Sequence, residues 1–526
     1  MNAALRWRPT LNQGWLLAFA AAFVGILILR LTALDSAPPG LHKDEAAFGY
    51  NAWTIAHYGL DQDGRPWPLF FTSFGDYKAP VYVYLLAPLT WVFPLTSTVE
   101  RLPAAFAGIT ICLLAVPLAY SVTRSLVVTL LTMVTAAIEP WIVIESRGGW
   151  DPILEIVGLT ALCVCLARAK GRHQAWWFFG AGVAVAFSVY AYPTGRLLAG
   201  FVAVLVLVAF LAVRPRQYAS LAVLPPTIVA YLVLLWWSLQ NPGALTARFD
   251  SISVLFDHPS VIEAARRALQ NYSQYFGVPF LFTRGDTQLV HGTGLGGVLL
   301  LTTAPVVFAG LLVAIRSWRQ PLARFALLAL AVAPIPAALT VDNSPDAPRA
   351  NGMMAFLLIF VVLGWAALWP LLAKHRLVAA AFFAAMAIEA GGYFADLYTQ
   401  WPSRAVVQWD TGQAEAIAEA SSLANGHTVW IANSLEEPYI FAYFKLLPDP
   451  NLVRSMTTEA VGMQQRFPQE IVAMAQPGDI MVFGPADTPP QGSTLLDRQQ
   501  VTVTTELVER TKPTPQTIVL ATIWRR

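Results

Sequence analysis

Runs of apolar residues dominate the first three quarters of the chain, and most are about 20 residues long, the length a helix needs to cross a bilayer. Eleven such runs lie at residues 15–34, 103–122, 125–144, 152–168, 175–192, 196–213, 218–237, 297–315, 324–340, 352–372 and 377–395. A twelfth candidate, at 79–95, is shorter and contains Pro80, Pro88 and Pro94. The pattern predicts a polytopic α-helical membrane protein with eleven transmembrane helices.

The basic residues of the short loops decide whether segment 79–95 crosses, because cytoplasmic loops collect Lys and Arg. If the N-terminus with Arg6 and Arg8 is inside and 79–95 does not cross, every short basic loop lies inside. These loops contain Arg124, Arg168, Lys170, Arg172, Arg214, Arg216, Arg316, Arg319, Arg324, Lys374 and Arg376. A crossing segment would export all of them. We therefore predict that 79–95 is re-entrant or interfacial, as irregular backbone at that depth must be covered by protein or line a cavity.

Three long segments then lie outside: a first loop at 35–102, a middle loop at 238–296 and a tail from 397 onward. An amphipathic stretch at 412–424 in the tail is accompanied by β-rich runs at 428–432, 479–483, 501–507 and 517–523. This alternation predicts a small α/β domain. We divide the chain into a transmembrane module, 1–396, and an extracytoplasmic domain, 397–526.

Composition supports the membrane assignment and excludes some functions. Hydrophobic residues make up 56% of the chain and charged residues 13%, whereas soluble domains carry about 25% charged residues. The net charge of +2 is small and dispersed, so we expect no nucleic-acid partner. Cys112, Cys163 and Cys165 lie in apolar runs, where they are interpreted as small buried hydrophobic residues.

Candidate chemistry begins in the first outer loop, where Asp44 and Glu45 follow the first apolar run. An acidic pair in such a place commonly caps the start of a helix. Lys78 lies further along the same loop, at the mouth of segment 79–95. This lysine could snorkel to the membrane surface, or it could hold an anionic lipid headgroup at the depth of the lipid phosphates.

A second polar cluster, containing Arg147 and Asp151, follows the third run and lies on the same predicted outer side. A carboxylate can take the proton from an acceptor hydroxyl while cations stabilise a departing phosphate. Arg284 and Arg349 lie in other outer loops and suit a phosphate-binding rim. These residues together favour displacement of a phosphate from a sugar.

The order of these motifs resembles the C-type (GT-C fold) glycosyltransferases. It is most similar to family 39, the phospholipid carrier-dependent enzymes that include protein O-mannosyltransferases and lipid A aminoarabinose transferases. The resemblance covers roughly residues 10–350 and is strongest between 40 and 155. It implies that Asp44 is the catalytic base, that Lys78 contacts the lipid-linked phosphate and that Asp151 is a second essential carboxylate. The family motif reads Lys-Pro-Pro, whereas this chain has Lys78-Ala79-Pro80.

The sequence thus leads to one main hypothesis, an inverting glycosyltransferase of the cell membrane with a polyprenyl-phosphate-linked sugar donor. Asp44, Glu45 and Asp151 are its predicted catalytic residues, and Lys78, Arg147, Arg284 and Arg349 are predicted to bind the donor phosphate. Membrane lipids are expected partners; the acceptor and the need for a divalent metal stay open. The alternatives are a transporter or lipid flippase, which usually shows repeated halves and mid-membrane ionisable residues, and an assembly scaffold.

Overall fold

The computed structural model describes residues 12–211, 218–342, 344–453, 457–504 and 515–526. The chain forms two compact units, each built from segments that are distant in sequence. The first contains Met1–Thr32, Ala104–Arg147 and Asp151–Asp396, and the second contains Ala33–Pro103, Gly148–Trp150 and Leu397–Arg526. Helix α4, Ser97–Thr123, passes from the second unit into the first.

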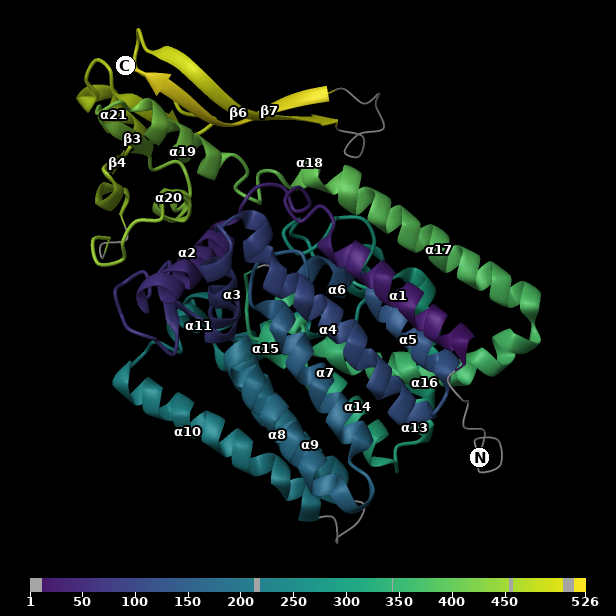
Figure 1. Cartoon of the computed structure of the whole chain (residues 1–526). Coiled ribbons are helices and arrows are strands. Elements are labelled where there is room, and N and C mark those ends of the chain that lie inside the picture. Colours follow the sequence, from purple (N-terminus) through teal and green to yellow (C-terminus); the bar gives the residue numbers. More distant parts are fainter. Residues whose placement is uncertain (1–11, 212–217, 343, 454–456, 505–514) are drawn as a thin grey trace. The chain divides into compact units, whose positions relative to one another are not determined.

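The first unit is helical. Its helices are α1 (Gln13–Leu31), α5 (Leu126–Ile138), α6 (Pro140–Glu145), α7 (Pro152–Arg168), α8 (Gln174–Ala191), α9 (Gly195–Leu211), α10 (Leu224–Gln240), α11 (Ala247–Ile252), α12 (Val261–Gln274), α13 (Ala304–Arg316), α14 (Pro321–Val332), α15 (Ile335–Ala338), α16 (Gly352–Lys374) and α17 (Arg376–Thr399). Helix α8 lies beside α7 and α9, and α13 lies beside α16 (Figure 1). Each of the eleven predicted apolar runs overlaps at least one helix, as expected for a polytopic membrane protein.

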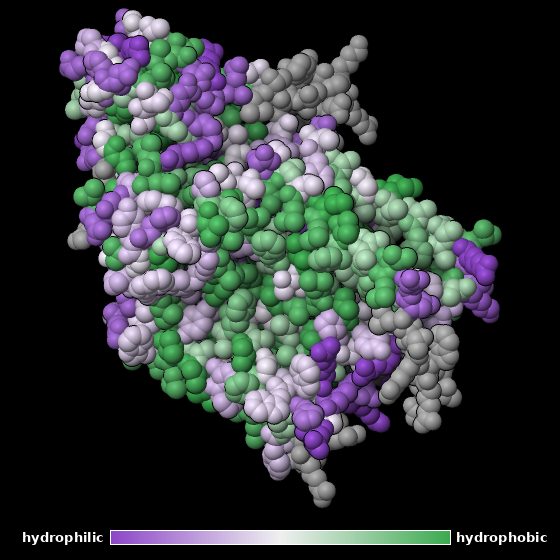
Figure 2. Space-filling view, in the orientation of Figure 1, coloured by the Kyte–Doolittle hydropathy of each residue, from purple (hydrophilic) through white to green (hydrophobic). Residues whose placement is uncertain are grey.

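Seven helical segments among the described residues are long and apolar enough to cross a membrane. Hydrophobic residues gather over the long helices of this unit on the face drawn in Figure 2. Glycine allows two of these helices to approach closely, because a Cβ atom at Gly310 of α13 would collide with the backbone of Phe360 in α16. Gly364 of α16 faces the backbone of Val306 in the same way. Small residues of this kind let membrane helices pack backbone to backbone.

One predicted run, 125–144, is divided between α5 and α6. Pro140 has no N–H to continue the helix, so α5 ends at Ile138 and α6 begins at the proline. The carboxylate of Glu139, at the break, accepts the N–H of Leu300 (3.0 Å), and the N–H of Trp141 donates to the carbonyl of Val298 (2.9 Å). The backbone and side-chain groups at the break are therefore bonded to residues 298–300, which precede α13.

The second unit combines the first loop with the tail. The loop contains α2 (Lys43–Tyr58), β1 (Phe71–Ser73), β2 (Asp76–Lys78) and α3 (Pro80–Val92), and the tail contains α18 (Trp401–Ala405), α19 (Gln413–Leu423), β3 (Val429–Ala432), α20 (Pro438–Leu446), β4 (Met463–Arg466), α21 (Pro468–Met474), β5 (Ile480–Phe483), β6 (Thr494–Thr504) and β7 (Pro515–Arg525). The tail strands form one sheet in the order β4-β3-β5-β7-β6, in which β3 is parallel to β4 and β5, and β7 is antiparallel to β5 and β6.

The predicted amphipathic stretch is α19, and the four predicted β-rich runs correspond to β3, β5, β6 and β7. Residues 505–507 of the predicted run 501–507 lie outside the described residues. Strand β4 was not predicted, because its sequence, Met463-Gln464-Gln465-Arg466, is polar after the first residue. It lies at an edge of the sheet, where only one side is paired and polar side chains are tolerated.

The loop and the tail share one hydrophobic core. Ala46, Ala47 and Tyr50 of α2 are buried against Ile440 and Tyr443 of α20 within the same cluster that includes β3 and β5. The hydroxyl of Tyr50 donates to the carbonyl of Pro448 (2.8 Å). The tail, Leu397–Arg526, groups with Ala33–Pro103, which includes most of the first loop, in the second unit.

Segment 79–95 contains the 13-residue helix α3, with Pro80 at its first turn and Pro88 inside it. At about 1.5 Å per residue such a helix is roughly 20 Å long, whereas a bilayer core is about 30 Å thick. Its packing partner is α2, where Phe48 and Tyr82 bring their ring centroids within 5.3 Å.

Candidate active site

Asp44 lies in the first turn of α2, and this turn is closed by side-chain caps. His42 is the N-cap residue, with an extended backbone, and its Nδ1 accepts the N–H of Asp44 (3.2 Å). Oε2 of Glu45 reaches back to accept the N–H of His42 (3.1 Å). This reciprocal pair is a capping box, with histidine in the position usually taken by Ser or Thr. It holds the carboxylate of Asp44 at the start of the helix.

Asp44 and Lys78, which are 34 positions apart in the sequence, form an ion pair. Lys78 Nζ lies 3.0 Å from Asp44 Oδ1, and the two side chains are 21% and 29% exposed. Burial works to raise the pKa of Asp44, but the charges of Lys78, His42 and Lys43 outweigh it and hold that pKa well below its usual range. The group is therefore a carboxylate at neutral pH, and it is still open to a ligand.

The position of Lys78 follows from a tight hairpin. Strands β1 and β2 pair with Phe71 opposite Lys78 and Ser73 opposite Asp76, leaving Phe74 and Gly75 as a two-residue turn. Both turn residues have positive φ, as a type I′ turn requires. Lys78 then ends β2, and α3 begins two residues later with a proline in its first turn. The ammonium group also lies 5.8 Å from the ring centroid of Phe74.

Glu45, the other predicted catalytic carboxylate of this loop, is fully buried. Arg101 forms a bidentate pair with it, through Nε to Oε1 and Nη2 to Oε2, both 2.7 Å. The N–H of Gly149 donates to the same Oε1 (2.8 Å). Arg101 donates further to the carbonyls of Leu34 (2.6 Å) and Gly40 (2.7 Å). Glu45 thus ties together the two ends of the first loop, and Asp44 is the more accessible carboxylate.

Arg101 was not among the predicted site residues. The charged pair Glu100-Arg101 directly before the apolar run 103–122 could have indicated it, because charges at such a boundary need a partner. The carboxylate of Glu100 is also buried, beside Glu45, and neither oxygen has a hydrogen-bond partner within the described part of the chain.

Arg147 and Asp151 belong to the first unit. The guanidinium group of Arg147 is buried and donates to the carbonyls of Leu29 (3.2 Å) and Thr32 (2.8 Å), at the C-terminal end of α1. The last carbonyls of a helix lack intrahelical donors, so Arg147 completes that end. Asp151 is buried and takes the N-cap position of α7, before Pro152.

Arg349 also belongs to the first unit and is bound by two aspartates. It pairs with Asp342 through Nη1 (2.6 Å) and Nη2 (3.0 Å), and its Nε lies 3.3 Å from Asp346. Asp286 accepts the N–H groups of Ala347 (2.6 Å) and Gln288 (2.8 Å). Burial, with the nearby charge of Asp346, raises the pKa of Asp286 to about 7.

Asp286 and Asp346 were not among the predicted site residues. Both are buried, and residues 286 and 347 are joined by a hydrogen bond across 61 positions of sequence. Asp286 follows a left-handed glycine, Gly285, that passes close to the backbone of Gly296.

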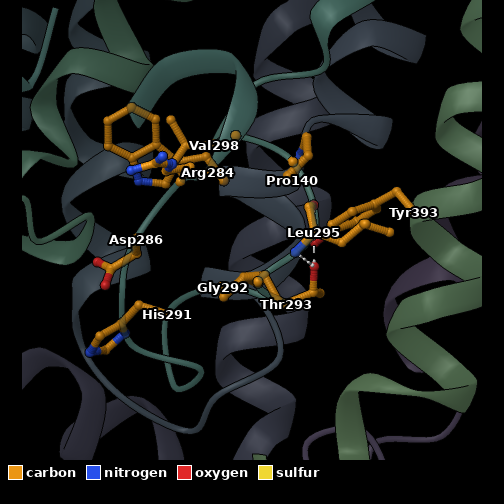
Figure 3. Close-up of a pocket in the computed structure, with 15 residues that line it drawn as sticks. Pro140, Arg284, Asp286, His291, Gly292, Thr293, Leu295, Val298 and Tyr393 are labelled. Atoms are coloured by element: carbon orange, nitrogen blue, oxygen red, sulfur yellow. Dashed lines mark hydrogen bonds between the residues drawn. The ribbon is translucent and has the colours of Figure 1, made fainter. Parts of the chain in front are cut away.

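A small pocket of the first unit is bordered by this glycine-rich loop (Figure 3). Its lining includes Arg284, Asp286 and His291, the loop from Gly292 to Val298, and Tyr393 of α17. The side chain of Arg284 is exposed, and within the described residues no carboxylate lies within ion-pair distance of it. Among the described residues, no protein acceptor engages the guanidinium group of Arg284, unlike those of Arg147 and Arg349.

Metal binding was left open by the sequence. The described residues contain no group of three or more His, Cys, Asp or Glu side chains arranged to hold a metal ion. Asp44 is matched instead by a lysine ammonium group.

These features define an integral membrane protein with a bundle of apolar helices and a sheet-bearing unit that carries a partly exposed Asp–Lys pair. Its fold is the GT-C fold. The chain is similar over 90% of its length to ArnT from Cupriavidus metallidurans bound to undecaprenyl phosphate, with a TM-score of 0.58, 13% identity and 94% of that chain covered. The apo state of the same ArnT gives a TM-score of 0.54 at 13% identity, with 90% of this chain and 93% of that chain covered.

The archaeal oligosaccharyltransferase AglB from Archaeoglobus fulgidus, in complex with an inhibitory peptide and a dolichol-phosphate, is also similar. It has a TM-score of 0.48 at 15% identity, over 83% of this chain and 60% of that chain. No protein-family model matches the sequence. No curated protein matches it either.

Proposed function

We propose that this protein is a glycosyltransferase that transfers a sugar from a polyprenyl-phosphate donor to an acceptor hydroxyl at the outer face of the membrane. The observation that carries the proposal is the Asp44–Lys78 pair, an ionised carboxylate 3.0 Å from an ammonium group, with both side chains partly exposed. The ArnT structure that shares the fold was solved with undecaprenyl phosphate, which supports a donor of this class.

The proposed reaction divides the work between the two groups. An alcohol is a poor nucleophile until its proton is removed, and a carboxylate within about 3 Å of that proton can accept it. Asp44 takes the proton as the acceptor oxygen bonds to the anomeric carbon. The bond from that carbon to the phosphate oxygen breaks, and its electron pair leaves with the phosphate. Direct displacement inverts the anomeric configuration and needs no covalent enzyme intermediate.

Lys78 stabilises the departing phosphate as negative charge develops on it. The same cation lowers the pKa of Asp44. A donor phosphate that shares Lys78 offsets part of its charge, so the carboxylate gains basicity when the donor is bound. The proposed base, Asp44, and the proposed phosphate ligand, Lys78, therefore influence each other through their ion pair.

The other predicted site residues are assigned different roles, according to whether protein partners hold their side chains. We assign Arg284 to donor-phosphate binding, because its guanidinium group is exposed. Asp151 keeps the proposed role of a second carboxylate that orients the acceptor or a cation. Glu45, Arg147 and Arg349 are held by protein partners, which favours a supporting role.

Paired measurements of donor binding and single-turnover rate test this proposal. Asp44→Asn keeps the size of the side chain but removes its basicity, so it should bind donor nearly normally and turn over at least about 100-fold more slowly. Lys78→Ala should instead weaken donor binding markedly. Asp76→Asn, on the same hairpin, is the matched control and should leave both quantities near those of the unchanged protein.

The acceptor and the sugar can be sought with a panel of radiolabelled polyprenyl-phosphate sugars, chasing the label into lipid, glycan and protein fractions. An Asp44→Asn protein that keeps its rate eliminates Asp44 as the base. Purified protein that transfers none of the labelled sugars, but carries them across vesicle membranes, would replace the enzyme with a flippase.

A further inference from the structure

The tail supplies a polar contact to the helix that carries Asp44. A helix begins with backbone N–H groups that have no intrahelical acceptor. In α2 the His42 ring takes the N–H of Asp44. The N–H of Lys43, one residue earlier, donates to Oδ2 of Asp410 (3.1 Å), which is 367 positions away in the sequence. The first turn is therefore capped partly from within and partly by the tail.

Asp410 is itself rigidly held. It is buried, and its φ of +47° is in the left-handed region that a non-glycine residue adopts only when its surroundings demand it. Its Oδ1 accepts from the side-chain amide of Gln413 (3.3 Å), and its carbonyl accepts the N–H of Gln413 (3.2 Å). The carboxylate that caps Lys43 thus has little freedom to move away.

Residues on both sides of Asp410 also pack against the start of α2 and the residues just before it. The indole of Trp409 packs edge-on against the His42 ring, with centroids 5.9 Å apart, and lies 5.5 Å from the guanidinium carbon of Arg101. A Cβ atom at Gly40 would lie 2.6 Å from the Cα of Thr411, so only glycine allows this approach. The tail and the loop meet here backbone to backbone.

A second carboxylate of the tail, that of Glu436, offsets the positive charge of Lys43. Lys43 Nζ forms an ion pair with Glu436, which lies in the loop after β3. Lys43 is adjacent to Asp44 in the sequence, and Glu436 neutralises it from the tail. Lys78 contacts Asp44 directly.

We infer that Asp410 is a positioning residue for the candidate base, acting through the cap on Lys43 to set the first turn of α2 and the aim of Asp44. The inference rests on the proposed function for its catalytic consequence. It also makes the tail part of the catalytic unit, since α2 loses a cap and a core when the tail is removed.

Two substitutions separate the cap from the charge. Asp410→Asn retains an oxygen that can accept the N–H of Lys43, whereas Asp410→Ala removes it. Asp410→Ala should lower kcat by about 10- to 100-fold, the cost of a small misplacement of a reacting group, while donor Kd changes by less than about twofold. Asp410→Asn should retain most of the rate. Glu415→Ala, which removes an exposed tail carboxylate paired with Lys445, is the control and should change neither quantity.

A readout that needs no activity keeps the test independent of the proposed function. Amide hydrogen exchange in the peptide covering residues 43–46 should quicken in Asp410→Ala and stay near normal in Asp410→Asn and Glu415→Ala. Unchanged exchange together with unchanged kcat in Asp410→Ala overturns the inference. An Asp410→Asn protein as impaired as Asp410→Ala also overturns it, because charge rather than the cap would then be responsible. Failure of Asp44→Asn to slow turnover, with faster exchange in Asp410→Ala, rejects only the catalytic role of Asp44.

Discussion

Arg101→Ala tests how the first loop is held together. Arg101 and Glu45 are both fully buried, and their guanidinium and carboxylate groups meet in two 2.7 Å hydrogen bonds. Removing one partner of such a pair leaves an uncompensated buried charge, at a cost of about 3–5 kcal/mol. The carbonyls of Leu34, Pro38 and Gly40 also lose their donor. We therefore expect Arg101→Ala to lower the free energy of unfolding by at least about 3 kcal/mol.

The assay is thermal unfolding of the detergent-solubilised protein. For a folded unit of about 200 residues, 3 kcal/mol corresponds to a fall in Tm of about 6–12 °C. Arg466→Ala is the matched control, because Arg466 pairs with Glu459 in the same unit through partly exposed side chains. Such surface pairs contribute about 0–1 kcal/mol, so the control should lower Tm by no more than about 4 °C.

A double variant, Arg101→Met with Glu45→Met, extends the argument. Replacing both charges by apolar groups removes the uncompensated charge, so this variant should be less destabilised than the sum of its two single variants by at least about 1 kcal/mol. If Arg101→Ala had the same Tm as the Arg466→Ala control, the reasoning would be refuted. Additive effects in the double variant would show that the two side chains stabilise the loop independently.

Two further predictions concern buried carboxylates. The pKa of Asp286 is raised on folding, so the folded state binds more protons than the unfolded state between about pH 4 and pH 7. Because of this carboxyl group, the free energy of unfolding falls as the pH rises through that window, by up to about 1.4 kcal/mol per pH unit. Asp286→Asn should therefore flatten the profile of Tm against pH. An unchanged profile would contradict this prediction. Gly149→Ala places a Cβ atom on the carboxylate of Glu100 and should lower Tm by several degrees. Gly392→Ala is the control, because the space around Gly392 is open, and it should leave Tm unchanged. Equal Tm values for the two variants would show that Glu100 moves aside freely.

The long apolar helices of the first unit were predictable from the apolar runs alone, whereas α11 and α12 lie outside those runs. Membrane-spanning segments must satisfy their backbone internally and expose apolar side chains, so length and hydropathy indicate them locally. The strands β3, β5 and β7 were equally visible, because each is a short apolar run between turn residues. Strand β4 was not, since an edge position imposes no apolar pattern on its four residues.

Asp44 and Lys78 were both predicted as site residues from the sequence, because they follow and precede apolar segments in an order of motifs that resembles a known family. Their separation of 3.0 Å was not predictable. It depends on a two-residue hairpin turn at Phe74 and Gly75 and on the caps of α2, and these place two side chains that no local periodicity relates.

By itself, the sequence determined the membrane class, the apolar helices, the α/β character of the tail and the residue types available for chemistry, because these follow from local composition and period. Only the tertiary structure decided which charged side chains pair with one another. It engages Glu45 with Arg101 and Arg349 with Asp342, and it leaves Asp44 facing Lys78. The Glu45–Arg101 pair joins residues 56 positions apart in the chain. Its complete burial makes the pairing obligatory, because an unpaired charge away from water is too costly to keep.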